Sequence, residues 1–170
     1  MESFKPIVDE YYPIFYKIAR SFTKKPADFE DLYQEMLIQV YQSLKNFRAQ
    51  SKISTWIYKV ALNTAMTYSR SSKKRKQEVE TGDMGGLDRA EETDGAARKE
   101  EKEREIEILY ESINELKKDD RAMILLHLEG KQYDEIAEIM GISKSNTGVK
   151  LMRIKKRLQS ILITKGYEQN

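Results

Sequence analysis

Residues 133–143 read Tyr-Asp-Glu-Ile-Ala-Glu-Ile-Met-Gly-Ile-Ser, and this stretch decides the fold of the C-terminal part of the chain. Its spacing is typical of a helix-turn-helix, in which two helices approach at a small residue and are joined by a tight turn. Ala137 is the small residue, and Gly141, four positions later, tolerates the positive φ that such a turn requires. Apolar anchors lie on both sides of the turn: Ile136, Ile142 and Leu151.

The helix expected to follow the turn is basic along its whole length. Residues 143–165 contain seven lysines and arginines and no acidic residue. In a helix-turn-helix, side chains near the start of the second helix contact base edges in the major groove, and later ones contact phosphates. We expect the DNA contacts to include Lys144, Ser145, Asn146, Lys150, Arg153 and Lys156. The alternative is a solvated basic helix in an ordinary helical bundle.

A second basic stretch lies in the N-terminal half. Residues 36–77 contain nine lysines and arginines and no acidic residue, although the net charge of the whole chain is only +2. Cations neutralise phosphates, and aromatic rings such as those of Phe47 and Trp56 stack on unpaired bases. This stretch therefore predicts a contact with nucleic acid in single-stranded form. The residues between the two basic stretches are predominantly acidic, which indicates two separate contacts with one polyanion.

The hydrophobic pattern predicts an all-α fold. Apolar residues recur at steps of three and four along residues 7–22, 29–44, 56–68 and 106–116, and nothing alternates with period two for long. Residues 71–97 contain four glycines among acidic residues and almost no large apolar side chains. Such a segment buries too little surface to offset its ordering entropy, so we expect a flexible acidic linker between two small helical domains.

The expected second helix carries a polar face beside its apolar stripe. Asp31, Gln34, Glu35 and Gln39 are linked by helical steps, and Ile38 lies among them. A solvated face and a docking surface for a cationic partner both explain the polar residues. An exposed aliphatic side chain at Ile38 favours docking slightly.

Several classes of site are not expected. The chain has no cysteine, which excludes disulfides and thiolate metal sites, and its one histidine, His127, has no acidic cluster at ligand spacing. No phosphate-binding glycine loop, nucleophile elbow or pair of catalytic carboxylates is present. We therefore expect no enzyme, cofactor or metal. With no signal peptide or membrane span visible, the cytoplasm is the expected compartment.

Three stretches together resemble the RNA polymerase sigma factors of the extracytoplasmic-function (ECF) group. Asp-Leu-Tyr-Gln-Glu at 31–35 is similar to the family's clamp helix. Residues 47–64, which begin Phe-Arg-Ala-Gln-Ser-Lys-Ile-Ser-Thr-Trp and end Asn-Thr, are similar to its promoter-melting segment. Residues 133–158 are similar to its C-terminal helix-turn-helix. The resemblance implies two helical domains, region 2 at 1–72 and region 4 at 101–165, with a linker at 73–100 and a tail at 166–170.

The resemblance also assigns roles to residues. Asp31, Gln34 and Glu35, with Ile38 and Gln39 on the same face, would bind the coiled coil of the largest catalytic subunit of core RNA polymerase. Residues matching Phe47 and Asn63 would capture a base flipped from the minus-ten promoter element, and Trp56 would support the loop between them. The minus-ten contacts would be Phe47, Arg48, Ser51, Lys52, Ser54, Lys59, Asn63 and Arg70. The second helix of the helix-turn-helix would read the minus-thirty-five element as duplex DNA, through the six polar and basic residues above together with Gly148, Val149 and Met152.

The second helix departs from the commonest family pattern at two positions. Thr147 stands where a larger aliphatic side chain usually points inward, and Gly148 is expected at an exposed position, where it would let the backbone approach DNA closely. This variant pattern is similar to sigma factors of the Bacteroidetes type.

The implied partners are core RNA polymerase, including the flap of its second subunit, promoter DNA and an anti-sigma factor, without membrane insertion. The linker would thread through the polymerase, although its sequence alone slightly favours a plain tether. The rival interpretation is a stand-alone helix-turn-helix regulator with an N-terminal sensing or dimerisation domain.

Overall fold

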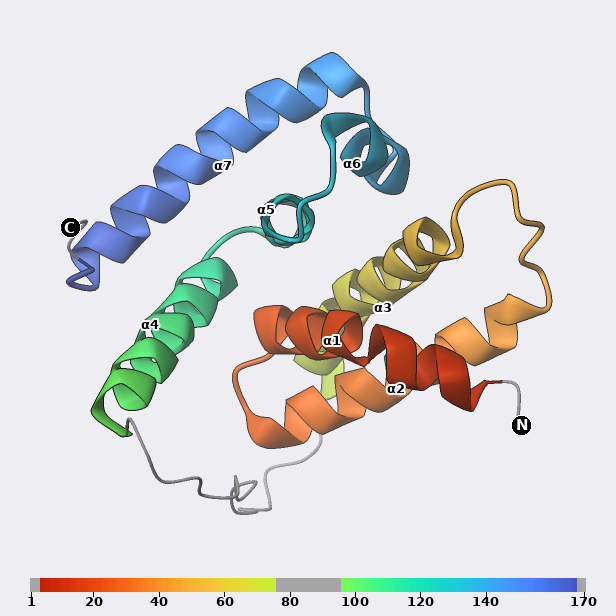
Figure 1. Ribbon diagram of the computed structural model, residues 1–170, viewed down its shortest axis with the longest axis horizontal. Helices are drawn as coiled ribbons and strands as arrows, with labels where there is room; N and C mark the ends of the chain where they lie inside the picture. The colour runs from red at the N-terminus through yellow and green to blue at the C-terminus, as the bar shows by residue number, and fades with distance from the viewer. Residues whose placement is uncertain (1–3, 76–95, 168–170) are drawn as a thin grey trace.

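The computed structural model describes residues 4–75 and 96–167, except for the side chains of residues 69–75. All regular structure in these two ranges is α-helical, as the hydrophobic pattern predicts (Figure 1). Three helices form the N-terminal part: α1 (Lys5–Phe22), α2 (Pro26–Leu44) and α3 (Ile53–Arg75). Four form the C-terminal part: α4 (Ala96–Asn114), α5 (Lys118–Leu128), α6 (Tyr133–Met140) and α7 (Lys144–Thr164).

The first three helices pack against one another through the apolar stripes expected from the sequence. Phe15 and Ile18 of α1, Leu32 and Met36 of α2, and Ile57 of α3 are fully buried. Aromatic contacts add to the seam between α1 and α2, where Tyr12 meets Tyr33 and Tyr16 meets Phe29 edge to face.

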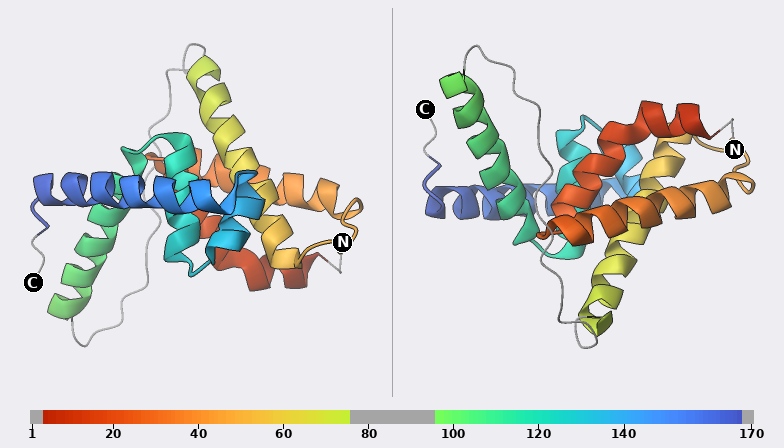
Figure 2. Two further views of the ribbon diagram at one scale, coloured as in Figure 1. Left: turned by 90° about the horizontal axis from the view of Figure 1, so that it is seen from above. Right: turned by 90° about the horizontal axis from the view of Figure 1, so that it is seen from below.

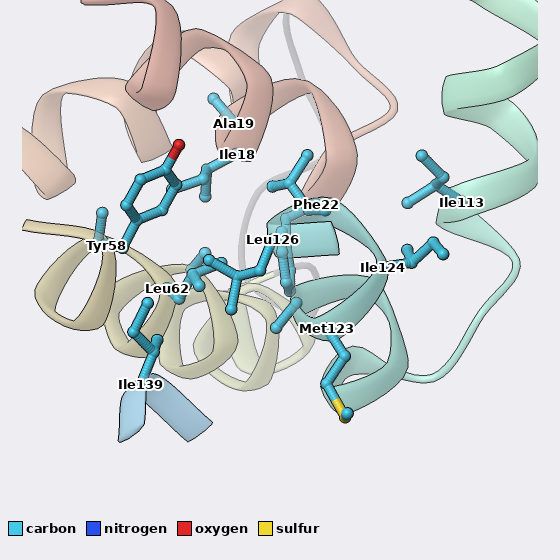
Figure 3. Close-up of a cluster of buried hydrophobic side chains, with 14 of the residues drawn as sticks. Ile18, Ala19, Phe22, Tyr58, Leu62, Ile113, Met123, Ile124, Leu126 and Ile139 are labelled. Atoms are coloured by element: carbon cyan, nitrogen blue, oxygen red, sulfur yellow. The ribbon is translucent and has the colours of Figure 1, made fainter. Parts of the chain in front are cut away.

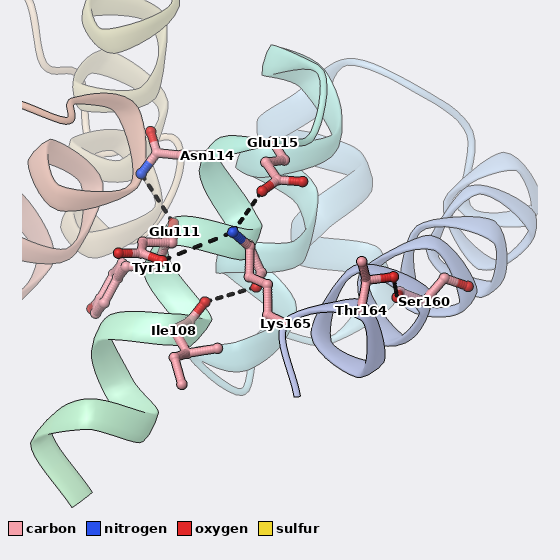
Figure 4. Close-up of polar contacts among 9 residues, drawn as sticks. Ile108, Tyr110, Glu111, Asn114, Glu115, Ser160, Thr164 and Lys165 are labelled. Atoms are coloured by element: carbon pink, nitrogen blue, oxygen red, sulfur yellow. Dashed lines mark hydrogen bonds and ion pairs between the residues drawn. The ribbon is translucent and has the colours of Figure 1, made fainter. Parts of the chain in front are cut away.

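Helix α5 lies at the centre of the molecule and is buried on most of its circumference. Five consecutive residues, 122–126, are buried, which is the pattern of a helix surrounded by other elements. Helices α1 and α2 lie on one face of the molecule and α7 on the opposite face (Figure 2). The end of α7 is joined to α4 by Lys165, whose Nζ lies 2.7 Å from a carboxylate oxygen of Glu115 and 3.8 Å from one of Glu111 (Figure 4).

The N-terminal and C-terminal parts share one hydrophobic core. Phe22 of α1 and Leu62 of α3 belong to the same buried cluster as Met123 of α5 and Ile139 of α6 (Figure 3). The sequence predicts two helical domains but not this contact between them. In the described residues the two parts form a single packed body.

The boundaries of the linker differ from expectation. Helix α3 continues to Arg75 and α4 begins at Ala96, so both ends of the expected 73–100 linker are helical. The remainder of the linker, 76–95, lies outside the described residues.

Candidate nucleic-acid interface

A groove of about 620 Å³ runs between α2 and α3. Helix α2 lines it with all five residues of the predicted docking face: Asp31, Gln34, Glu35, Ile38 and Gln39. The Gln39 side chain donates a hydrogen bond of 3.0 Å to Glu35 Oε1, while Ile38 is 47% exposed. The polar face is therefore one wall of a concave surface that carries an exposed aliphatic side chain.

Helix α3 forms the other wall of the groove, and Asn63 lies on it. The groove thus brings a predicted minus-ten contact beside the predicted polymerase contacts. Lys59, one helical turn before Asn63, lines a different cavity together with Phe47. The structure does not bring Phe47 and Asn63 into one cavity. Arg70 lies on α3, but its side chain is outside the described residues.

The loop between α2 and α3 is held against the start of α3 by two aromatic rings. The Phe47 and Trp56 ring centroids are 5.2 Å apart at an interplanar angle of 44°, and both residues are half-buried. Ala49 has a φ of 53°, an unusual conformation for a residue with a Cβ. Arg48 and Lys52 are exposed on the loop, whereas Ser51 and Ser54 are half-buried. Trp56 therefore supports the loop by packing against Phe47, as its position in the sequence predicts.

The turn between α6 and α7 has the geometry that the sequence predicts. Gly141 has a φ of 69°, and its N–H donates to the carbonyl of Ala137. Ser143 begins α7 by accepting a hydrogen bond of 3.1 Å from the N–H of Asn146. Thr147 is fully buried and donates to the Ser143 carbonyl at 3.0 Å, so it points inward as expected. These contacts fix the direction in which α7 leaves the turn.

The outward face of α7 presents most of the predicted DNA contacts. Its buried line consists of Thr147, Leu151, Ile154 and Leu158. The exposed residues are Lys144, Ser145, Asn146, Val149, Lys150, Met152, Arg153 and Lys156. Lys144 is in an exposed ion pair of 2.8 Å with Asp134 at the start of α6.

Gly148 does not have the exposed position that the sequence suggests. It is half-buried, and a Cβ placed on it would lie 3.5 Å from the ring of Tyr133. The Tyr133 ring from α6 therefore covers this side of α7. The exposed position expected for Gly148 is wrong, whereas a close backbone approach to DNA there stays a prediction.

A polar contact between the two parts of the chain surrounds Tyr58. Glu129, in the turn after α5, accepts a hydrogen bond of 2.6 Å from Lys17 of α1 and one of 3.3 Å from the Tyr58 hydroxyl. Lys131 lies over the Tyr58 ring, 5.0 Å from its centroid. Burial, reinforced by the neighbouring carboxylate, raises the pKa of Tyr58 well above its usual value. The phenol therefore stays protonated and donates to Glu129.

An apolar groove of about 380 Å³, which is not expected from the sequence, lies on the other side of α7. Leu128 of α5 and Ile163 of α7 are 50% and 60% exposed at its edges. Residues from α5, α7 and the segment after α7 line it: Ile124, His127, Leu128, Lys155, Leu158, Gln159, Leu162, Ile163 and Tyr167. In the sequence, the groove is indicated only by Leu128 and Ile163. Each is a large aliphatic residue at the end of its helix, and each is followed by a polar residue.

Within residues 4–75 and 96–167, no three histidine or acidic side chains gather closely enough to hold a metal ion. No described helix is both long and apolar enough to cross a membrane.

Comparison with known proteins decides the family. Residues 7–75 match the family model for Sigma-70 region 2, and residues 106–158 match that for Sigma-70 region 4. The ECF RNA polymerase sigma-E factor of Haemophilus influenzae is 30% identical over 142 residues, which cover 78% of this chain and 74% of the relative. The chain belongs to the ECF group of the sigma-70 family. The ECF RNA polymerase sigma-E factor of Escherichia coli is 29% identical over 143 residues, or 79% of this chain and 73% of the relative.

Two solved structures have the same fold as this sigma factor. The sigma factor RpoE of Bartonella quintana, solved in complex with the anti-sigma factor NepR, gives a TM-score of 0.66 at 21% identity. The match covers 95% of this chain and 98% of that one. CnrH, solved in complex with the cytosolic domain of CnrY, gives a TM-score of 0.64 at 20% identity and covers 96% of this chain and 89% of that one.

The family settles what the N-terminal part is. Helices α1–α3 are region 2 of a sigma factor, not a sensing or dimerisation domain, and the rival interpretation as a stand-alone regulator is set aside. Helices α5–α7, with the end of α4, are region 4. This sigma factor directs the initiation of transcription, and sigma factors are non-catalytic DNA-binding regulators.

Proposed function

We propose that this sigma factor binds core RNA polymerase through the α2 wall of the groove between α2 and α3. The observation that carries the proposal is the gathering of Asp31, Glu35 and the exposed Ile38 on one concave wall. Carboxylates steer and orient a cationic partner, and an aliphatic side chain at the centre adds apolar contact area. The partner surface would be the basic coiled coil of the largest catalytic subunit. A dissociable subunit of this kind has no catalytic activity of its own and acts in the cytoplasm.

Promoter opening would occur on the adjoining surface of region 2. Asn63 has an amide able to hydrogen-bond a base edge, and it lies across the groove from the polymerase contacts. Arg48, Lys52 and Lys59 are exposed cations around the loop that contains Phe47, and they can contact phosphates of separated strands. Two surfaces, one at Asn63 and one at Phe47, would then hold the minus-ten element.

Region 4 would complete promoter recognition. The outward face of α7 would read the minus-thirty-five element in the major groove, with Lys156 contacting phosphate. The apolar groove between α5 and α7 would receive the flap of the second polymerase subunit. An anti-sigma factor is the further partner that we propose, since the structural neighbour RpoE was solved in complex with the anti-sigma factor NepR.

A charge reversal on α2 tests the polymerase contact. Glu35→Arg weakens the binding of labelled protein to core polymerase at least tenfold, measured by fluorescence anisotropy. Glu30→Arg is the matched control, because Glu30 is an exposed acid on the same helix but does not line the groove. Equal affinity of the Glu35 variant and the unaltered protein would contradict the proposal.

A second variant separates binding from promoter opening. Asn63→Ala leaves core binding intact and impairs strand opening, measured with a fluorescent base placed in the minus-ten element. If the variant opens the promoter normally, Asn63 has no role in capturing a base.

A further inference from the structure

The outward face of α7 has an apolar centre. Thr147 and Leu151 lie on its buried line. At 3.6 residues per turn, Val149, which stands midway between them in sequence, points almost directly away from the core. Val149 is 45% exposed, and Met152, one turn later on the same side of the helix, is 56% exposed. The middle of the face that region 4 turns outward is therefore made of two large apolar side chains.

Polar residues surround this centre. Ser145 and Lys156 lie before and after it along the helix, and Asn146 and Arg153 lie beside it. Single exposed aliphatic residues are common on protein surfaces and need no explanation. Val149 and Met152 differ from such cases because they are neighbours at the centre of a basic face. Neither can neutralise a phosphate, so their contribution to a DNA complex must come from apolar contact with bases.

The major groove of DNA offers one apolar group for such contact, the C5-methyl of thymine. We propose that Val149 and Met152 read thymine methyl groups, so that the minus-thirty-five element of this sigma factor carries thymine at two adjacent base pairs. Residues three apart in a helix are separated by about 4.5 Å along its axis, close to the base-pair step of about 3.4 Å. Val149 lies in the second turn of α7, within the part of a recognition helix that reaches base edges.

This inference rests on the proposed function of α7 as the reader of the minus-thirty-five element. The methyl contact adds a specific base to that function, because a methyl group identifies thymine whichever other bases Asn146 and Arg153 read. Uracil pairs as thymine does and lacks only that methyl group. Replacing thymine with uracil therefore removes the proposed contact without altering any hydrogen bond.

The experiment uses core polymerase reconstituted with the full chain. A pool of promoter duplexes with a randomised minus-thirty-five element is passed through repeated binding selection, and the enriched element is sequenced. Adjacent thymines are expected. Each is then replaced by uracil in turn, and binding is measured by competition, with a replacement in the spacer as the DNA control. Each replacement in the element weakens binding about fourfold, the change expected when the burial of one methyl group is lost.

The two variants Val149→Ala and Met152→Ala identify which side chain reads which base. Each loses sensitivity to uracil at its own position and keeps it at the other, so each variant is the control for its partner. Both side chains are exposed, and alanine is a good helix former, so folding is preserved.

The possible results distinguish a failure of the methyl contact from a failure of the proposed function of α7. An enriched element without thymine, or a uracil effect that persists unchanged in both variants, overturns the methyl contact and leaves α7 as the reader of the element. A pool in which no sequence is enriched at the minus-thirty-five position overturns both.

Discussion

At the scale of single residues, Gly148 is an unusual residue for the interior of a long helix. Glycine in a helix interior costs about 1 kcal/mol relative to alanine. A Cβ at this position would meet the Tyr133 ring at 3.5 Å, an ordinary van der Waals distance. Gly148→Ala is therefore expected to raise the free energy of unfolding by about 0.5–1 kcal/mol, measured by urea denaturation. Gly141→Ala, where φ is 69°, is the control and lowers the free energy of unfolding. A loss of stability in the Gly148 variant would show that the Tyr133 ring leaves no room for a Cβ at this position.

Ser143 gives a second prediction at this scale. Its hydroxyl accepts from the N–H of Asn146 and so caps the helix that carries the DNA contacts. Ser143→Ala is expected to lower the free energy of unfolding by about 1 kcal/mol. Ser160→Ala is the matched control, because the Ser160 hydroxyl donates only to a carbonyl within the same helix and is exposed. Thermal unfolding of the two variants compares them, and equal midpoints would exclude a capping role.

The residues that the sequence identifies best are those whose role depends on local backbone geometry. Gly141 is recognisable because a left-handed turn four residues after a small helical residue strongly favours glycine. The position of Gly148 is not recognisable, since it depends on the direction of the Tyr133 ring from another helix. Local rules describe a residue within its own helix and say nothing of the side chain that covers it.

At the scale of elements, α7 has two sides for which we propose different partners, and two neighbouring lysines distinguish them. Lys156 lies on the outward face, whereas Lys155 lines the apolar groove. Lys156→Ala is expected to reduce the slope of the logarithm of promoter affinity against the logarithm of salt concentration by about 1, because one phosphate contact is lost. Lys155→Ala leaves that slope unchanged. Affinities measured from low to moderate salt test this, and equal slopes in the two variants would contradict the orientation of α7 on DNA.

The α2–α3 groove shows how far periodicity predicts an element's role. The steps between Asp31, Gln34 and Glu35 place them on one face of α2, and the structure confirms that face. The sequence does not indicate that Asn63 faces the same groove while Phe47 faces another cavity. That separation depends on how α3 crosses α2, which is set by the packing of three helices.

At the scale of the whole molecule, regions 2 and 4 form one body. Asn114 of α4 donates to the carbonyl of Arg20 of α1 at 3.1 Å, and the Arg20 guanidinium lies 4.4 Å from the centroid of the Tyr110 ring. Ile139 of α6 is buried beside Leu62 of α3. Such pairs are distant in sequence and belong to separate hydrophobic stripes. Each stripe predicts a buried face but not which other face covers it, so the sequence cannot reveal this contact.

The packed arrangement brings the two proposed promoter-reading surfaces together. Asn63 of region 2 and Lys150 of region 4 line the same cavity of about 140 Å³. The minus-ten and minus-thirty-five elements are about 25 base pairs apart, or about 85 Å of duplex. A compact chain of this length is only about 40 Å across. The two regions must therefore separate before both elements are bound.

Glu129 is the residue whose loss most directly tests this separation. It accepts from both Lys17 and the buried Tyr58 hydroxyl, so Glu129→Ala removes these two polar contacts between the regions and leaves that hydroxyl without an acceptor. The expected cost to the packed state is about 1–3 kcal/mol.

Because the chain contains no cysteine, Glu30→Cys in α2 and Ser160→Cys in α7 provide unique sites for a pair of fluorophores. Energy transfer between them is high in the free protein, lower in the Glu129 variant, and lowest when core polymerase and promoter DNA are bound. Tyr58→Phe, which keeps the ring and removes the hydroxyl, is expected to give an intermediate value. High transfer in the promoter complex would show that regions 2 and 4 remain packed while reading DNA, and the same transfer in the Glu129 variant as in the unaltered protein would show that Glu129 does not hold them together.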